Sequence, residues 1–186
     1  MNYIIVDTAN TFFRARHVIK GALNEKIGMA LHITLNSIRR VWQEFKGDHV
    51  VFCLEGKSWR RDVYPRYKMN RKTAREALTV SEKEEEEVFW ETFTHFKDFI
   101  DTKTNCTIIQ HEQLEADDLI AGWVNAHPND NHVIISTDSD FAQLIKPNVK
   151  QYNGKETDCK VSKAIEKYTE YKVFLDKAHK KLACNQ

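Results

Sequence analysis

Short runs of apolar, strand-forming residues recur along the chain, and each leads into an acidic side chain. Three of these runs cover residues 3–6, 49–54 and 132–137. The acids that follow them are Asp7, Glu55 and Asp138. Near-continuous apolar runs of this length predict buried strands of a parallel sheet. Because the carboxyl ends of parallel strands open on one edge, where ligands of open α/β sheets bind, we expect the three carboxylates to lie together.

Between the runs, the apolar residues recur with helical spacing. The i, i+3, i+4, i+7 pattern predicts a helix over about residues 29–45 and a second helix from Ser81 onward, where Ser81 and Glu84 match a capping box. The apolar face of the second helix consists of Phe89, Phe93, Phe96 and Ile100. A strand at residues 107–110 precedes a helix over about 116–126. The order β-α-β-α-β-α-β predicts an α/β fold, doubly wound, with a mainly parallel sheet and helices on both faces.

Further acids lie at the start of the last predicted helix and beyond the last predicted strand. Glu115 and Asp118 share a helix face, whereas Asp117 joins them only if the helix begins close to this point. Taken alone, these acids are better explained by their favourable position at a positive helix end. Asp138 and Asp140 also fit an Asx turn that closes a strand. Helix capping does not explain acids after three strands, so the carboxylates together predict a site for hard divalent cations.

Basic and aromatic residues are concentrated between residues 57 and 75. The bases of this segment are Lys57, Arg60, Arg61, Arg66, Lys68, Arg71, Lys72 and Arg75. Trp59, Tyr64 and Tyr67 are interleaved with them. This composition is typical of a channel for a nucleic-acid strand, because cations follow phosphates and rings stack on bases, although a solvated basic loop is the alternative. The segment leaves the predicted sheet directly after Glu55, so we expect it to lie over the acidic edge.

Composition narrows the class of protein without naming a partner. The 186 residues contain 28 Lys and Arg against 27 Asp and Glu, so net charge alone is uninformative. The four cysteines form no C-x-x-C pair, and Cys53 and Cys106 lie in predicted strands, which predicts reduced core thiols. The sequence has no apolar stretch of membrane-spanning length and no leader-like opening, so we expect a soluble, cytoplasmic protein with no membrane partner.

Taken in order, the motifs resemble those of the 5′ nucleases, the family of flap endonucleases, the 5′-3′ exonuclease domains of bacterial DNA polymerase I and phage exonucleases with RNase H activity. The motifs are Asp7 with Asn10, Glu55-Gly56 with Trp59-Arg60, the run from Tyr64 to Arg71, the run from Glu115 to Asp118, and the run from Ser136 to Leu144. The resemblance covers residues 1 to about 150. It implies a PIN-like fold, which agrees with the doubly wound sheet predicted above.

The resemblance also implies an activity and a set of site residues. The activity is that of a metal-dependent 5′-3′ exonuclease or flap endonuclease acting on DNA, with RNA–DNA hybrids as a further substrate. Two Mg²⁺ or Mn²⁺ ions, the second weakly held, are expected on Asp7, Glu55, Glu115, Asp117, Asp118, Asp138 and Asp140. Lys68 and Arg71 are the expected catalytic cations of a helical arch. The expected substrate contacts are Arg60, Arg61, Arg66, Tyr67, Lys72 and Arg75.

The sequence departs from the family pattern at two places. Residue 55 is Glu where the family usually has Asp, and the extra methylene can move a ligand by about 1 Å, which can cost about a hundredfold in rate. After Gly154, nothing resembles the glycine-rich helix-hairpin region that binds the duplex in the family. We therefore expect a catalytic domain over residues 1–153, truncated before that region, with the basic arch at about 57–80. A Lys-rich, partly helical tail is expected over 154–186.

These departures leave two classes of function open. One is a nuclease impaired by loss of its C-terminal half, with the helix-hairpin region supplied by a separate polypeptide. The other is a catalytically weak or inactive nucleic-acid-binding or regulatory protein derived from a 5′ nuclease. A phosphatase of the haloacid dehalogenase type is disfavoured, because it requires Asp-x-Asp on the first strand and residues 7–9 read Asp-Thr-Ala.

Overall fold

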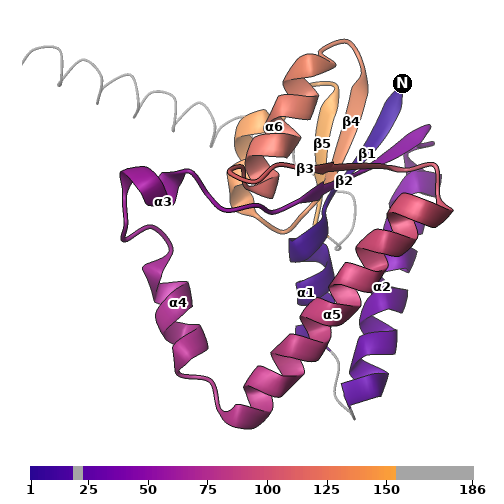
Figure 1. The fold of residues 1–186 in the computed structure, drawn as a ribbon. Helices are drawn as coiled ribbons and strands as arrows, with labels where there is room; N and C mark the ends of the chain where they lie inside the picture. The colour runs from indigo at the N-terminus through magenta and orange to yellow at the C-terminus, as the bar shows by residue number, and fades with distance from the viewer. Residues whose placement is uncertain (19–22, 154–186) are drawn as a thin grey trace, which may run out of the picture.

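Five parallel strands form the single sheet of the computed structural model, which describes residues 1–18 and 23–153 (Figure 1). The strands are β1 (Asn2–Asp7), β2 (His49–Leu54), β3 (Thr107–Gln110), β4 (Asn131–Ile135) and β5 (Val149–Tyr152). Their order is β3-β2-β1-β4-β5, so the chain builds one half of the sheet outward from β1 and then crosses to the other side. Ile5 on the central strand lies opposite Val51 and Ile134. The predicted doubly wound fold is confirmed.

Helices cover both faces of this sheet (Figure 1). They are α1 (Thr8–Val18), α2 (Leu23–Glu44), α3 (Arg60–Val63), α4 (Met69–Glu76), α5 (Val80–Lys103), α6 (Ala116–Ala126) and the 3₁₀ helix η1 (Ser139–Leu144). Alternate residues of β1 point to opposite faces. Ile5 packs with Ile120 of α6, whereas Ile4 packs with Val41 of α2 and Phe96 of α5. All four apolar α5 residues predicted for the core are buried.

The predicted cap of α5 is wrong by two residues. The helix is capped by Thr79 rather than by Ser81, and Glu82 rather than Glu84 closes the capping box. The Thr79 side chain accepts the N–H of Glu82, and the Glu82 side chain accepts the N–H of Thr79 at 2.8 Å. The Glu-rich sequence supplies an acid at the third helical position in either register, so spacing alone did not select between Thr79 and Ser81.

The arch segment consists of α3, α4 and their flanking loops, and it stands away from the sheet (Figure 1). Neither α3 nor α4 has a buried residue. The arch begins at Gly56, where a Cβ would collide with the carbonyl oxygen of His111, so only glycine allows the two backbones to approach this closely. The N–H of Gly56 donates to the carbonyl of Leu114 at 2.8 Å. This pairing brings the start of the arch beside the N-terminus of α6.

Several further predictions concern the cysteines, the strands and the tail. Cys53 is buried in β2 as predicted, but Cys106 lies just before β3 and is only partly buried; both are free thiols. Strand β5 was not predicted from the sequence. The predicted tail over 154–186 lies outside the described residues. Within the described residues, no helix has both the length and the apolar character that crossing a membrane requires.

Candidate active site

The acids predicted from the strand ends line one cleft at the carboxyl edge of the sheet. The cleft has a volume of about 270 Å³. Its carboxylates are the predicted acids Asp7, Glu55, Glu115, Asp117 and Asp138, together with Glu86 of α5. Asp7 ends β1, Glu55 follows β2, and Asp138 caps η1 shortly after β4. Of the seven predicted carboxylates, Asp118 and Asp140 do not line this cleft.

Asp7 is the most deeply placed of the strand-end acids and is only 7% exposed. Its carboxylate accepts hydrogen bonds from the hydroxyl of Ser136 at 2.8 Å and from the N–H of Asn10 at 3.4 Å. Burial, together with the nearby charges of Glu55 and Asp138, raises the pKa of Asp7 to about 6 against the lowering effect of these two bonds. The ionised form is therefore under-compensated, and a positive charge in the cleft would stabilise it.

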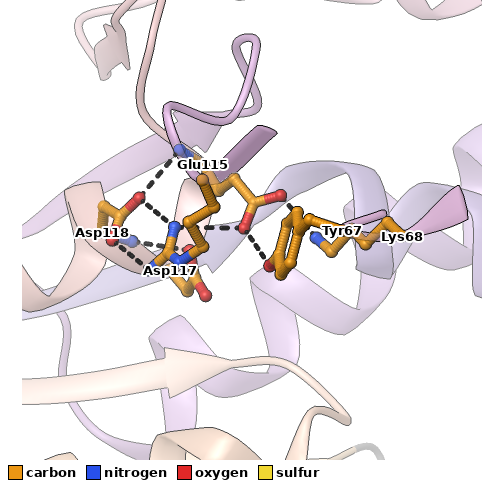
Figure 2. Close-up of polar contacts among 6 residues, drawn as sticks. Tyr67, Lys68, Glu115, Asp117 and Asp118 are labelled. Atoms are coloured by element: carbon orange, nitrogen blue, oxygen red, sulfur yellow. Dashed lines mark hydrogen bonds and ion pairs between the residues drawn. The ribbon is translucent and has the colours of Figure 1, made fainter. Parts of the chain in front are cut away.

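The acids at the start of α6 are held by side chains of the arch (Figure 2). Glu115 is 5% exposed and receives the ammonium of Lys68 at 2.6 Å and the hydroxyl of Tyr67 at 2.8 Å. Arg60 donates two hydrogen bonds to Asp118, at 2.8 and 2.7 Å, and a third to Glu115 at 3.2 Å. The arch thus reaches across the cleft and neutralises this acidic pair with its own bases.

These contacts lower the pKa of some acids of the site and not of others. Burial alone would raise the pKa of Glu115, but the bonds from Lys68 and Tyr67 hold it below its ordinary value. The bond from Arg60 lowers the pKa of Asp118. By contrast, burial raises the pKa of Asp117, and the charge of neighbouring Asp118 adds to that rise. The under-compensated charge of the cleft therefore lies on Asp7 and Asp117.

The start of α6 explains which acid of the cluster enters the cleft. The helix begins at Ala116, so Asp118 is the third helical residue, and its side chain accepts the N–H of Glu115 at 3.1 Å in a capping box. Asp118 therefore has the capping role that was weighed against a metal site. Asp117 lies one residue earlier and lines the cleft instead.

Asp138 combines the two roles that its sequence context allowed. Its carboxylate accepts the N–H of Asp140 at 3.0 Å, which closes the Asx turn at the start of η1, and it also lines the cleft. Within the described part of the chain, no three His, Cys, Asp or Glu side chains lie close enough together to hold a metal ion as they stand. The complete seven-carboxylate metal site stays a prediction.

The arch cations face the acids from the other side. Lys68, Arg71 and Arg75 line the acidic cleft and also a larger hollow of about 930 Å³ beneath the arch, which Arg61 and Lys72 line as well. Lys68 has a φ of 53°, a left-handed conformation that is uncommon outside glycine and marks a strained position.

The predicted substrate contacts differ in whether they line the two hollows. Arg66 is exposed and lines neither hollow, whereas Arg60 is turned toward the acids. Arg75 pairs with Glu86, with its Nε 3.0 Å from the Oε1 of Glu86.

Two aromatic residues of the cleft, Phe13 and Trp90, were not predicted from the sequence. No sequence pattern singled out these two residues, and only the fold shows that they line the acidic cleft.

Sequence comparison identifies the family of the chain. The profile of the family described as "5′-3′ exonuclease, N-terminal resolvase-like domain" matches residues 2–174. The chain belongs to this family. The flap endonuclease Xni of Aliivibrio fischeri is similar to this 5′-3′ exonuclease family member, with 26% identity over 156 residues. That match covers 81% of the chain and 55% of the relative, so the chain spans about half the relative's length.

Solved structures similar to this family member come from phage T5. The T5 5′-exonuclease with bound divalent zinc ions has a TM-score of 0.68 and 25% identity, and the match covers 82% of this chain and 55% of that one. A T5 D15 flap endonuclease in a pseudo-enzyme-product complex with DNA and metal ions has a TM-score of 0.64 and 26% identity, with coverage of 82% and 54%. These matches agree with the PIN-like α/β fold predicted from the sequence.

Proposed function

We propose that this protein is a divalent-metal-dependent 5′-3′ exonuclease or flap endonuclease that hydrolyses phosphodiester bonds of DNA. The observation that carries the proposal is a single cleft in which five of the predicted metal-site carboxylates face Lys68 and Arg71. Membership of the 5′-3′ exonuclease family supports it, as do the flap endonuclease relatives and the T5 structures with metal ions and with DNA.

The donor set of the cleft fits a hard divalent cation. All of its candidate ligands are carboxylates, the donors that Mg²⁺ and Mn²⁺ prefer. Burial is the main cause of the raised pKa of Asp7, and the charges of Glu55 and Asp138 add to it; a cation in the cleft would stabilise the ionised form against both effects. We assign one ion to Asp7, Glu55 and Asp138, whose side chains would move together around it, and a second, weaker one to Asp117 with Glu115. Bound there, divalent ions would neutralise phosphate charge and activate the attacking water.

The chain's own cations would act on the opposite side of the phosphate. Lys68 and Arg71 line the wall facing the acids, where fixed donors stabilise charge that develops in the transition state. Because the Lys68 ammonium is bound to Glu115 at 2.6 Å, it must exchange this carboxylate for a phosphate oxygen when substrate and metal enter. Ser136 and Asn10 keep the Asp7 carboxylate oriented throughout, since their bonds to it do not involve the arch.

The test is turnover of 5′-labelled flap and nicked duplexes with Mg²⁺ or Mn²⁺, with a chelator as control. Asp138→Asn is the sharpest variant, because asparagine can still accept the N–H of Asp140 and keep the turn while removing the charge. We expect a loss of about a hundredfold, since even residues behind a metal ligand cost tenfold to a hundredfold. Asp101→Asn, at an exposed position of α5, should leave turnover unchanged. Cleavage that survives the chelator would contradict the proposal.

A second candidate is a nucleic-acid-binding or regulatory protein with little or no turnover. The way Arg60, Tyr67 and Lys68 occupy Glu115 and Asp118 favours it, because those contacts withhold two acids from metal ions. Binding of flap DNA without cleavage at any Mg²⁺ or Mn²⁺ concentration would select this candidate. Cleavage of RNA–DNA hybrids, and a separate polypeptide that supplies the helix-hairpin region, stay predictions from the sequence.

A further inference from the structure

Trp90 is an aromatic side chain in the acidic cleft that the proposed chemistry does not use. It lies on α5, is 38% exposed, and lines the cleft together with Phe13. Its ring packs on Phe13, with centroids 4.7 Å apart, and meets Phe93 edge-on at 5.7 Å. Phe93 is buried, so one side of the indole is anchored in the core while the rest faces the cleft.

Two charged residues fix the orientation of this indole. Its Nε1 donates to the carboxylate of Glu86 at 3.4 Å, and the same Glu86 oxygen pairs with Arg75 at 3.0 Å. The guanidinium carbon of Arg75 lies over the Trp90 ring, 5.8 Å from its centroid. Because Glu86 already neutralises Arg75, this arginine is less suited to the substrate contact predicted from the sequence. Its position over the ring requires another explanation.

We propose that Trp90 is a specificity-determining residue that stacks on the base of a nucleotide beside the scissile phosphate, in a single-stranded 5′ segment of the substrate. The inference rests on the proposed function, because the cleft that Trp90 lines is the one assigned to cleavage. Every base has an aromatic face, so stacking binds a strand without selecting its sequence. Trp90 would thus favour unpaired nucleotides, whose faces are free, over paired ones.

The space above the indole suits a flat ring. A base between the indole and a guanidinium makes two contacts of about 3.5 Å each, which require about 7 Å in total. The present 5.8 Å separation needs to widen by only about 1 Å. The Arg75 side chain is 62% exposed and extends from α4, which has no buried residue, so little packing opposes this movement. Arg75 then covers the outer face of the base.

The experiment is an abasic scan of binding. Flap oligonucleotides that lack one base at successive positions of the 5′ strand are bound to the protein in chelator, and again with Ca²⁺. For the wild type, we expect one abasic position, within about two nucleotides of the scissile bond, to weaken binding about tenfold. For Trp90→Leu, which keeps an apolar contact to Phe13, the intact and abasic strands should bind alike. Phe99→Leu, at a 51% exposed position of the same helix, is the matched control and should keep the tenfold difference.

Fluorescence makes the test independent of how well Trp90→Leu folds. Trp90→Phe preserves a ring in the core, and subtracting its signal from that of the wild type isolates the Trp90 emission. We expect the intact strand to quench this emission and the strand abasic at the sensitive position to leave it unchanged. An equal abasic effect in the wild type and in Trp90→Leu, or equal quenching by both strands, would overturn the stacking role while leaving the nuclease proposal in place. A wild type that binds no flap at all would overturn both.

Discussion

Lys68 has two competing partners: Glu115 in the protein without substrate, and a phosphate oxygen in the proposed reaction. Its ammonium neutralises Glu115, which is nearly inaccessible to solvent, and the pair is linked at 2.6 Å. Burial opposes the charged form, yet the contact with Glu115 raises the pKa of Lys68 above its ordinary value. The strained φ of Lys68 agrees with a side chain that is positioned for a task rather than for stability. Lys68 therefore neutralises Glu115 in the absence of substrate, and in the proposed reaction it binds a phosphate oxygen instead.

We predict that Lys68→Met destabilises the metal-free protein and that Mg²⁺ reverses much of the loss. Without the ammonium, the buried charge of Glu115 keeps only the Tyr67 hydroxyl and the longer contact from Arg60 at 3.2 Å. We expect this loss to cost roughly 1–3 kcal/mol in the free energy of unfolding. A divalent ion can then take the place of the ammonium, so the thermal midpoint should rise at lower Mg²⁺ concentration than in the wild type. Turnover should nevertheless fall about a hundredfold, because a donor to the phosphate is missing.

Thermal unfolding against Mg²⁺ concentration, with turnover measured in parallel, checks this prediction. Lys72→Met is the control, since the Lys72 side chain is 77% exposed and its ion pair with Glu76 is long, at 3.9 Å. It should change neither the stability nor its response to Mg²⁺. If Mg²⁺ does not raise the thermal midpoint of the destabilised Lys68→Met variant, Glu115 does not belong to a metal site.

Among the elements, α5 is the one that joins the arch to the core, and its start is set by Thr79. We predict that Thr79→Ala lowers the free energy of unfolding by about 1 kcal/mol, because the N–H of Glu82 loses its capping oxygen. Ser81→Ala is the matched control: Ser81 lies inside the helix and should contribute only a few tenths of a kcal/mol. Chemical denaturation of both variants decides the register, and a larger loss at Ser81 would support the box predicted from the sequence.

The same element shows where sequence reasoning ends. The apolar period of α5 predicted the burial of Phe89, Phe93 and Phe96, because such a period reports the face that leaves water. It could not show that Trp90, one position along, faces an acidic cleft made by distant segments. Likewise, strand ends predicted where Asp7 and Glu55 lie. The pairing of Lys68 with Glu115 depends on how the arch folds back over 47 residues, and no local pattern records this.

The whole molecule has a net charge of only +1. Its opposite charges are nevertheless separated, with acids on one side of the cleft and bases on the other. The acids are fixed to the ends of strands and helices of the core, whereas many of the bases belong to an arch that buries no residue of α3 or α4. The acidic side is therefore rigid and the basic side can adjust. A strand of nucleic acid held between them would meet fixed carboxylates on one side and adaptable cations on the other.

This arrangement predicts which arch cations contact the strand. Arg61 lines the hollow beneath the arch and Arg66 does not, although both carry the same charge in the same segment. Each phosphate contact on a single strand contributes about 0.7 to the slope of log affinity against log salt. We therefore expect Arg61→Ala to flatten that slope by about 0.7 and Arg66→Ala to leave it unchanged. The measurement is binding of a 5′ single-stranded flap in chelator between low and moderate salt. Equal slopes for the wild type and both variants would mean that the hollow does not hold the strand, and equal flattening by both variants would mean that the arch acts only through its total charge.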